Sequence, residues 1–185
     1  LTSWGIVMGV ERVRREMGIL ERIASYIPGY RGYKEKELRR ETDILVRRKV
    51  SSLLAEAKDM LNSSMSPAAA RRLAYDPEAR FTFENLRAEI DRATQRIDKA
   101  VAGYAGLFDA VKVKEDKLDA VIDHDLSLIE RAERVKILAS ELVGKEVGSD
   151  EWGEKLRALR SAVSEIDKLI DERTNILKGL TEVAD

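Results

Sequence analysis

The chain offers few side chains that could bind a metal, and the most suggestive group surrounds its single histidine. His124 stands between Asp123 and Asp125, and an imidazole with carboxylates is a donor set that zinc accepts. A di-iron helical bundle needs a Glu-x-x-His sequence on each of two helices. Position 121 is valine and a second histidine is missing, so the sequence excludes such a centre. We expect His124 to be an exposed helix residue flanked by two surface aspartates.

Other residues typical of catalysis are equally sparse. The sequence has no cysteine, which excludes disulfides and thiolate chemistry, and no Gly-x-x-x-x-Gly-Lys-Ser/Thr loop to hold a nucleotide phosphate. Asp109 and Asp125 could form a buried acid pair, but an N-cap and a solvated side chain are the simpler interpretation. We therefore expect no metal, no cofactor and no catalytic residue.

The clearest local signal is a Gly-Tyr-x-Gly phrase that occurs twice, at residues 29–32 and 103–106. Glycine adopts positive φ and destabilises helix interiors, so both phrases predict breaks between helices. Aromatic side chains close to both phrases could line a ligand pocket, or they could close the end of a helical bundle with their hydroxyls in water. The candidate binding residues are Tyr30, Arg31, Tyr33, Lys34, Tyr104, Phe108, Asp109 and Lys112.

Long amphipathic helices must position these residues. Charged residues make up 36% of the 185 residues and aromatic residues 5%, a composition typical of long helices and coiled coils. Apolar residues recur at alternating spacings of three and four, which is the signal of a helix with one buried face. The expected stripes are Ile6, Val10, Val13, Met17, Leu20, Ala24 and Ile27; Leu38, Thr42, Leu45, Val50, Leu53, Ala57 and Leu61; Phe83, Leu86, Ile90, Ala93, Ile97 and Ala100; Leu118, Val121, Leu128, Ala132, Val135, Ala139 and Leu142; Leu156, Leu159, Val163, Ile166, Ile170, Leu177 and Leu180.

The helix boundaries follow from capping residues and breakers. The first helix ends at Pro28, and the second begins near residue 33 or 34. Ser66 and the proline after it predict the start of a short helix at 67–75, and Ser149 caps the last helix. The heptad phase of 83–100 continues to 142, which would allow one long rod. The glycines and the acidic residues after them favour a turn between about 103 and 114.

The predicted fold is an all-α, antiparallel up-down bundle of four long helices with coiled-coil-like packing. Residues 1–27 form an additional N-terminal amphipathic helix, and residues 28–185 form the bundle. In this topology both Gly-Tyr-x-Gly phrases lie at one end of the bundle. We call that end, with residues 28–36 and 103–116, the connector pole.

Charge gives no strong indication of a partner. The 33 basic and 34 acidic side chains nearly cancel, so there is no general attraction to nucleic acid or to an anionic membrane. The clusters of basic residues at 14–15, 39–40, 47–49 and 71–72 are mostly interleaved with glutamates, and we interpret them as solvated helix surface. No apolar run has the length of about 20 residues that spans a membrane. We expect a cytoplasmic protein that recognises no specific nucleic acid.

The two Gly-Tyr phrases carry a resemblance to a known family. The segments Ile27-Pro28-Gly29-Tyr30-Arg31-Gly32-Tyr33-Lys34-Glu35-Lys36-Glu37 and Gly103-Tyr104-Ala105-Gly106-Leu107-Phe108-Asp109-Ala110-Val111-Lys112-Val113 resemble a family of uncharacterised prokaryotic helical proteins. Members carry aromatic residues near positions 122 and 124, where this chain has Ile122 and His124. The resemblance implies a non-helical connector at the second phrase, and it implies no activity.

These observations favour a non-catalytic interaction or scaffold protein that contacts an unidentified protein partner at the connector pole. The N-terminal helix would dock on the bundle or pair with a second copy, giving a homo-oligomer. An alternative is a small-molecule- or metal-dependent enzyme whose site at the same pole uses Asp109, Tyr30 and Tyr104. A third interpretation is a peripheral membrane protein anchored by residues 4–27.

Overall fold

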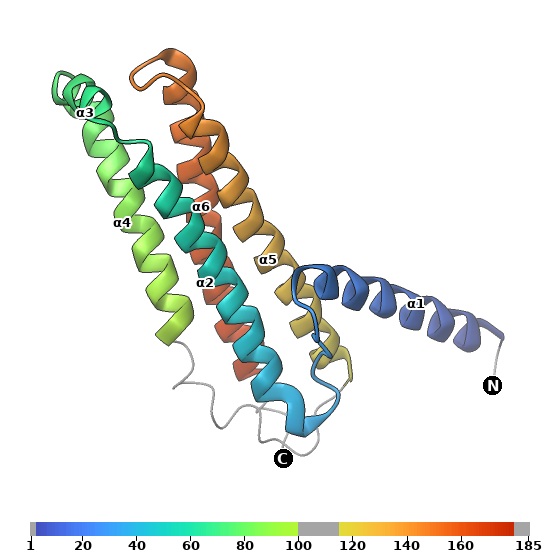
Figure 1. The fold of residues 1–185 in the computed structure, drawn as a ribbon. Helices are drawn as coiled ribbons and strands as arrows, with labels where there is room; N and C mark the ends of the chain where they lie inside the picture. Colours follow the sequence, from blue (N-terminus) through green and yellow to red (C-terminus); the bar gives the residue numbers. More distant parts are fainter. Residues whose placement is uncertain (1–2, 100–114, 180–185) are drawn as a thin grey trace.

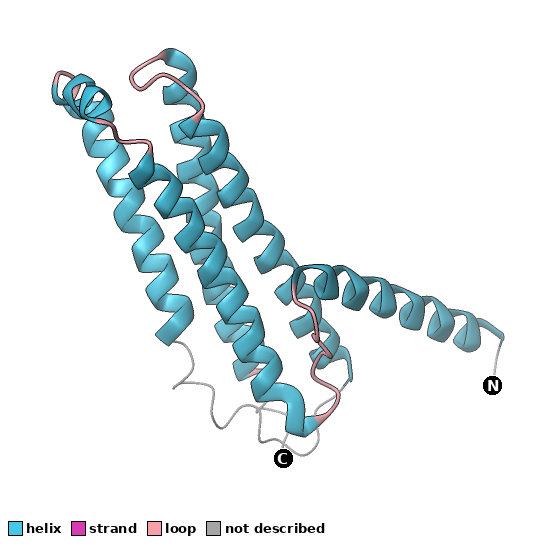
Figure 2. Ribbon diagram, viewed as in Figure 1, coloured by secondary structure: helices cyan, strands magenta, loops and turns pink. Residues whose placement is uncertain are grey.

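The computed structural model describes residues 3–99 and 115–179, and every regular element in these ranges is a helix (Figure 2). The prediction of an all-α fold is confirmed for this part of the chain. The elements in chain order are α1 (Ser3–Tyr26), the single 3-10 turn η1 (Lys36–Leu38), α2 (Arg39–Ser63), α3 (Pro67–Ala74), α4 (Pro77–Lys99), α5 (Glu115–Val143) and α6 (Asp150–Lys178).

The long helices α2, α4, α5 and α6 lie lengthwise beside one another (Figure 1). Helix α2 contacts α4 and α5, and α6 contacts the same two helices. Partly exposed ion pairs cross these four contacts, and each such pair contributes only about 0–1 kcal/mol. The apolar interior must therefore provide most of the stability. The cross-helix pairs are Lys58–Asp91, Arg96–Asp167, Arg131–Glu165 and Lys136–Glu56.

The interior consists largely of the predicted stripes. Leu53 on α2, Ile90 on α4, Val135 on α5 and Leu159 on α6 have no exposed surface. A fully buried side chain of this size stabilises the fold by about 1.5–3 kcal/mol relative to an exposed one. Two stripe positions, 100 and 180, and the predicted turn at 103–114 lie outside the described residues.

Capping hydrogen bonds confirm two of the predicted helix starts. The Ser66 hydroxyl oxygen accepts a hydrogen bond from the backbone N–H of Ala69 at 3.1 Å, and Pro67 occupies the first position of α3. The Ser149 hydroxyl oxygen accepts from the backbone N–H of Trp152 at 3.1 Å at the start of α6. Each cap satisfies an N–H that the helix itself leaves without a partner.

The second long helix begins later than the sequence predicted. Residues 33 and 34 belong to an extended connector, and α2 starts only at Arg39. Gly29 and Gly32 have φ of +87° and +73°, so the chain turns at both. Thr42 donates its hydroxyl to the carbonyl of Gly32 at 2.9 Å, and Arg39 donates its Nε–H to the carbonyl of Tyr33 at 2.8 Å. These bonds replace the helical ones, and they let Tyr33 turn into the interior.

Helix α1 extends away from the long helices, and only its second half contacts α5 (Figure 1). Ile23 is fully buried there and Ile19 is partly buried, whereas Val13 and Met17 are 55% and 57% exposed. At 3.6 residues per turn, Ile19 and Ile23 lie about 120° around the helix from Val13 and Met17. The part of the predicted stripe with Val13 and Met17 therefore does not dock, whereas Leu20 and Ile27 of the same stripe pack against the core.

Candidate functional site

Several polar side chains are buried where the connector, α2, α5 and α6 meet. Asp125 on α5 has no exposed surface, and Arg173 on α6 is 2% exposed. Asp43 and Arg47 on α2 are 2% and 4% exposed. Tyr30 of the first Gly-Tyr-x-Gly phrase and Tyr33, which directly follows that phrase, complete the group. We call these residues the buried cluster: Tyr30, Tyr33, Asp43, Arg47, Asp125 and Arg173.

Arg173 lies at the centre of the buried cluster and joins its two carboxylates. One Nη donates to Oδ1 of Asp43 at 2.6 Å, and the other donates to Oδ1 of Asp125. Arg47 donates its Nε–H to Oδ2 of Asp43 at 2.8 Å. Each carboxylate thus faces at least one guanidinium, an arrangement of charge-assisted hydrogen bonds that suits arginine better than lysine.

The two tyrosines attach the connector to this group. Tyr33 donates its hydroxyl to Oδ2 of Asp125 at 2.6 Å, and Tyr30 donates to the same oxygen at 3.1 Å. Arg173 in turn donates to the hydroxyl oxygen of Tyr33 at 3.1 Å. The two rings meet edge to face with centroids 6.5 Å apart. The prediction that the tyrosine hydroxyls reach water is wrong for this pair, because both are used inside the protein.

The pKa shifts in the buried cluster favour groups that keep one protonation state over groups that titrate. Burial raises the pKa of the Asp125 carboxyl, and the charge of Arg173 and the tyrosine hydrogen bonds oppose that effect. Burial alone would lower the pKa of Arg173, but Asp125, Tyr33 and Asp43 raise it well above its ordinary value. Burial and the charge of Asp125 raise the pKa of both Tyr30 and Tyr33, so they remain hydrogen-bond donors.

His124 is buried and not exposed as the sequence analysis predicted. Its side chain is 7% exposed, and both ring nitrogens are buried. Burial lowers the pKa of His124 to about 4, and the charge of Arg173 acts in the same direction. The backbone of Leu169 opposes both effects without compensating for them. The imidazole is therefore neutral at pH 7. Asp125, the next residue in the chain, was also expected in solvent and is buried as well.

The structure brings together only some of the predicted binding residues. Tyr30 and Tyr33 meet in the interior, at 6% and 1% exposed. Arg31 and Lys34 are exposed, and Lys34 forms an ion pair with Glu16 of α1 at 2.8 Å. The other four predicted residues lie in the range 100–114, outside the described residues: Tyr104, Phe108, Asp109 and Lys112.

Sequence reasoning missed the charged half of the buried cluster, although a signal was present. Asp125 stands between Val121 and Leu128 at spacings of four and three, and Arg173 stands in the same way between Ile170 and Leu177. Both occupy positions where the heptad calls for an apolar residue. A charge at such a position indicates a buried polar partner on a neighbouring helix. Two arginines expected at the solvated surface, Arg39 and Arg47, are also buried, and they donate to the carbonyl of Tyr33 and to Asp43.

The buried cluster can hold the connector, α2, α5 and α6 in place relative to one another. Every carboxylate and hydroxyl of the buried cluster is engaged in a hydrogen bond inside the protein. In the two described ranges, no group of three or more histidine, aspartate or glutamate side chains is placed to hold a metal ion. Nor does any helix of these ranges have the length and apolar character needed to cross a lipid bilayer.

Comparison with models of protein families, with curated proteins and with solved structures found no match. The resemblance carried by the two Gly-Tyr phrases therefore rests on those residues alone.

A pair of glycine variants tests how the connector is held. A Cβ on Gly32 would lie 3.3 Å from Cδ1 of Ile122 and 3.4 Å from Cδ2 of Leu20, whereas a Cβ on Gly29 would meet nothing within 4 Å. Positive φ costs any alanine about 1–2 kcal/mol, so Gly29→Ala should lower the free energy of unfolding by that amount. Gly32→Ala should cost more in urea denaturation, because α1 and α5 must also give way. An equal or smaller loss for Gly32→Ala would contradict this account.

Proposed function

We propose that the protein is a non-catalytic interaction protein, in which a helical bundle supports α1 as a docking arm. The bundle would be the antiparallel up-down arrangement of α2, α4, α5 and α6 with coiled-coil-like packing. Its neighbour contacts support this, as does the connection of α5 to α6 by residues 144–149. Sustained spacings of three and four favour the shallow crossing angle of such bundles.

The observation that carries the proposal is the exposed apolar face of α1. Val13 and Met17 lie one helical turn apart and are both more than half exposed. Residues spaced in this way form the ridge that one helix presents to another. A stripe of this kind on a helix that extends from the body is a surface for a partner.

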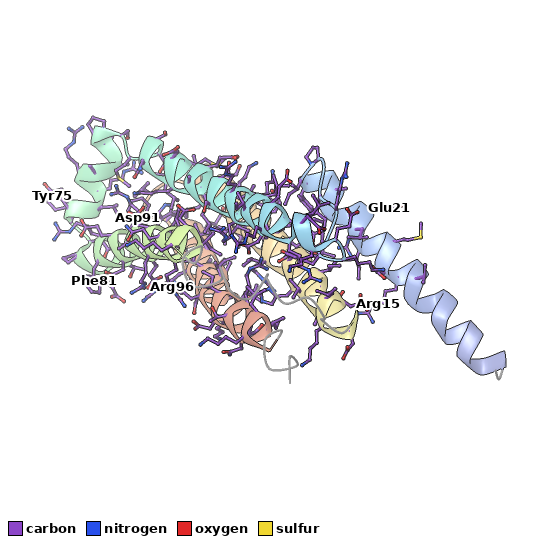
Figure 3. All side chains as sticks on the ribbon, turned by 90° about the horizontal axis from the view of Figure 1, so that it is seen from below. Arg15, Glu21, Tyr75, Phe81, Asp91 and Arg96 are labelled. Carbon is purple, nitrogen blue, oxygen red and sulfur yellow. The ribbon has the colours of Figure 1, made fainter. Side chains whose placement is uncertain are left out.

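Several contacts hold the arm in a defined direction. Ile23 is buried against the body, and Arg15 forms an ion pair with Asp123 of α5 at 3.3 Å. Figure 3 shows Arg15 where α1 passes beside α5. The connector that follows α1 is fixed by Tyr30 and Tyr33 in the buried cluster. The partner would thus meet a pre-oriented helix, which lowers the entropic cost of binding.

The connector pole belongs to the same proposal, but the contact surface that it offers is charged and not aromatic. Its described half presents Arg31 and Lys34 to solvent, while the tyrosines are internal. A hollow of about 360 Å³ lies beside Arg31, large enough for a side chain of a partner. It is lined by Gly29, Arg31, Leu38, Glu41, Thr42 and Leu45.

The test is affinity purification from the native cell with an arm variant and a matched control. Val13→Asp with Met17→Asp places two charges on the exposed face of α1. Tyr75→Asp places a charge on a side chain that is 90% exposed, at the end of the molecule opposite α1 (Figure 3). We expect the wild type and Tyr75→Asp to recover the same proteins and the arm variant to lose them. Equal recovery by all three, with unchanged circular dichroism, would refute the proposed role of α1.

A further inference from the structure

Helix α1 and the connector after it are bonded to each other. The N–H of Ile27 donates to the carbonyl of Ile23 at 2.8 Å, so the helical bonding pattern continues past the end of α1. Lys34, near the other end of the connector, forms an ion pair with Glu16 of α1 at 2.8 Å. The connector therefore folds back along α1, and the two can move as one piece. We call α1 and residues 27–34 the cover.

The cover lies over the buried cluster on α5. Figure 1 shows the connector beside α5, between the end of α1 and the start of α2. Tyr30 and Tyr33 both donate to Oδ2 of Asp125, and a Cβ on Gly32 would touch Ile122. With the cover in place, Asp125 has no exposed surface and Ile122 is 2% exposed. Access to this part of α5 therefore requires that the cover moves.

The buried cluster divides into two halves that belong to different parts of the molecule. The ionic half lies on α2, α5 and α6, where Arg173 bonds to Asp43 and Asp125 and Arg47 bonds to Asp43. The cover provides the two tyrosine hydroxyls. If the cover leaves, each carboxylate keeps a guanidinium, so no buried charge is left without its counter-ion. The long helices therefore do not need the cover to keep their charges paired.

The other described contacts of the cover with α5 involve few buried side chains. The ion pairs Arg15–Asp123 and Arg22–Glu130 lie at the surface, where such pairs contribute little. Ile23 is fully buried, but α2, α4, α5 and α6 share apolar stripes along their length. A region with few buried apolar contacts opens at a lower free energy than the core of the same protein.

A short exposed segment joins the cover to α2. Glu35, Lys36 and Glu37 are exposed, and η1 contains no buried residue. A hinge consists of a few loop or element-terminal residues that absorb a change in φ and ψ. Two side chains of α2 bond to connector carbonyls, and water can replace both donors after opening. Residues 35–38 can therefore serve as the hinge of the cover.

We propose that the cover opens as one unit about residues 35–38 while α2, α4, α5 and α6 stay folded. The closed state is the major one, so α1 keeps the direction described above. Opening turns α1 away from α5 and brings Asp125 and Ile122 to the surface. The cover is thus an autoinhibitory contact, because another helix can bind this part of α5 only by displacing it. Opening needs no partner, so its test is independent of the proposed function.

Thiol labelling of the full chain tests whether the cover opens separately. The chain has no cysteine of its own, and both Ile23 on α1 and Ile90 on α4 are 0% exposed. Ile23→Cys and Ile90→Cys are therefore matched variants with one buried thiol each. Under native conditions we expect dithiobis(nitrobenzoate) to label Ile23→Cys at least about tenfold faster, because its thiol becomes accessible without unfolding of the long helices. Equal labelling rates would overturn the proposal.

Second changes in the Ile23→Cys chain identify what controls the opening. Tyr33→Phe removes a hydrogen bond to a charged acceptor and should speed labelling about tenfold. Tyr75→Phe makes the same change at a 90% exposed side chain and should leave the rate unchanged. Ile90→Val should raise the equilibrium constant of global unfolding about fivefold without changing the labelling rate. A rate that rises with Ile90→Val would show that cover and bundle open only together, and would overturn the proposal.

Hydrogen exchange of the unmodified chain measures the same opening without a cysteine. The N–H groups of Ile27 and Tyr30 are bonded inside the cover and report on it directly. We expect them to exchange at least about tenfold faster, relative to their unprotected rates, than the slowest N–H groups of α2, α5 and α6. Equal protection of the cover and the long helices would overturn the proposal, whichever proteins the chain captures.

Discussion

Replacing Arg173 by leucine should lower the free energy of unfolding by about 3–5 kcal/mol. The substitution removes the guanidinium that contacts both Asp43 and Asp125. Asp125, which has no exposed surface, would keep only its two tyrosine donors. A buried carboxylate without a cation costs far more than the ion pair contributes, because desolvation is no longer compensated. Urea denaturation followed by circular dichroism measures the loss.

A surface arginine provides the matched control. Arg160 forms an ion pair with Glu89 at 3.3 Å, and its side chain is 48% exposed. Arg160→Leu should change the stability by less than about 1 kcal/mol. Neutralising the carboxylates in the Arg173→Leu background, with Asp43→Asn and Asp125→Asn, should recover part of the loss. A loss of stability for Arg173→Leu as small as that for Arg160→Leu would show that the carboxylates of the buried cluster do not depend on Arg173.

Acid should destabilise the fold through His124, and replacing it by leucine should remove that effect. The pKa of His124 is about 4 in the folded chain, against an ordinary value of 6.5. Between these values the unfolded chain binds the proton and the folded chain does not, so stability falls as the pH decreases. The contribution is fully present above pH 6.5 and is lost as the pH falls through 4. It amounts to about 3 kcal/mol at 1.36 kcal/mol per pKa unit.

The measurement is a set of urea denaturation curves for the wild type and His124→Leu between pH 7 and pH 4. Protonation of carboxylates with a lowered pKa, such as Glu141 and Glu151, also makes the fold less stable in acid. Both proteins contain these carboxylates, so their effect is the same in each. The difference between the two chains therefore isolates the histidine. Parallel pH dependences would mean that the imidazole binds its proton equally in the folded and the unfolded chain, and would refute the lowered pKa of His124.

Much of the secondary structure could be predicted because its signals are local. A serine followed by proline at 66–67 and a serine before two acidic residues at 149–151 specify helix starts through bonds to the nearest N–H groups. The start of α2 could not be predicted in this way. It depends on Thr42 and Arg39 bonding to connector carbonyls, and those bonds exist only after the connector has turned at Gly29 and Gly32.

The candidate site was harder to predict because its members are far apart in the sequence. Arg173 and Asp125 stand at positions that their helices bury, and nothing in a single helix says which residue of another helix is the partner of such a charge. Part of the docking face of α1 was missed for a related reason. The predicted stripe packs through Leu20 and Ile27, but beyond them the neighbouring residues Ile19 and Ile23 face the core and leave Met17 exposed.

The length of chain between the members of the buried cluster has a consequence for synthesis. Arg173 bonds to Tyr33, which precedes it by 140 residues, and to Asp43, which precedes it by 130. A ribosome releases the N-terminal helix long before the last helix emerges. Until Arg173 arrives, the two carboxylates have no common counter-ion, and Asp125 has no guanidinium to bond to. Helix α6 thus completes the buried cluster, because Asp125 and Tyr33 gain their contacts with Arg173 only after this helix has been synthesised.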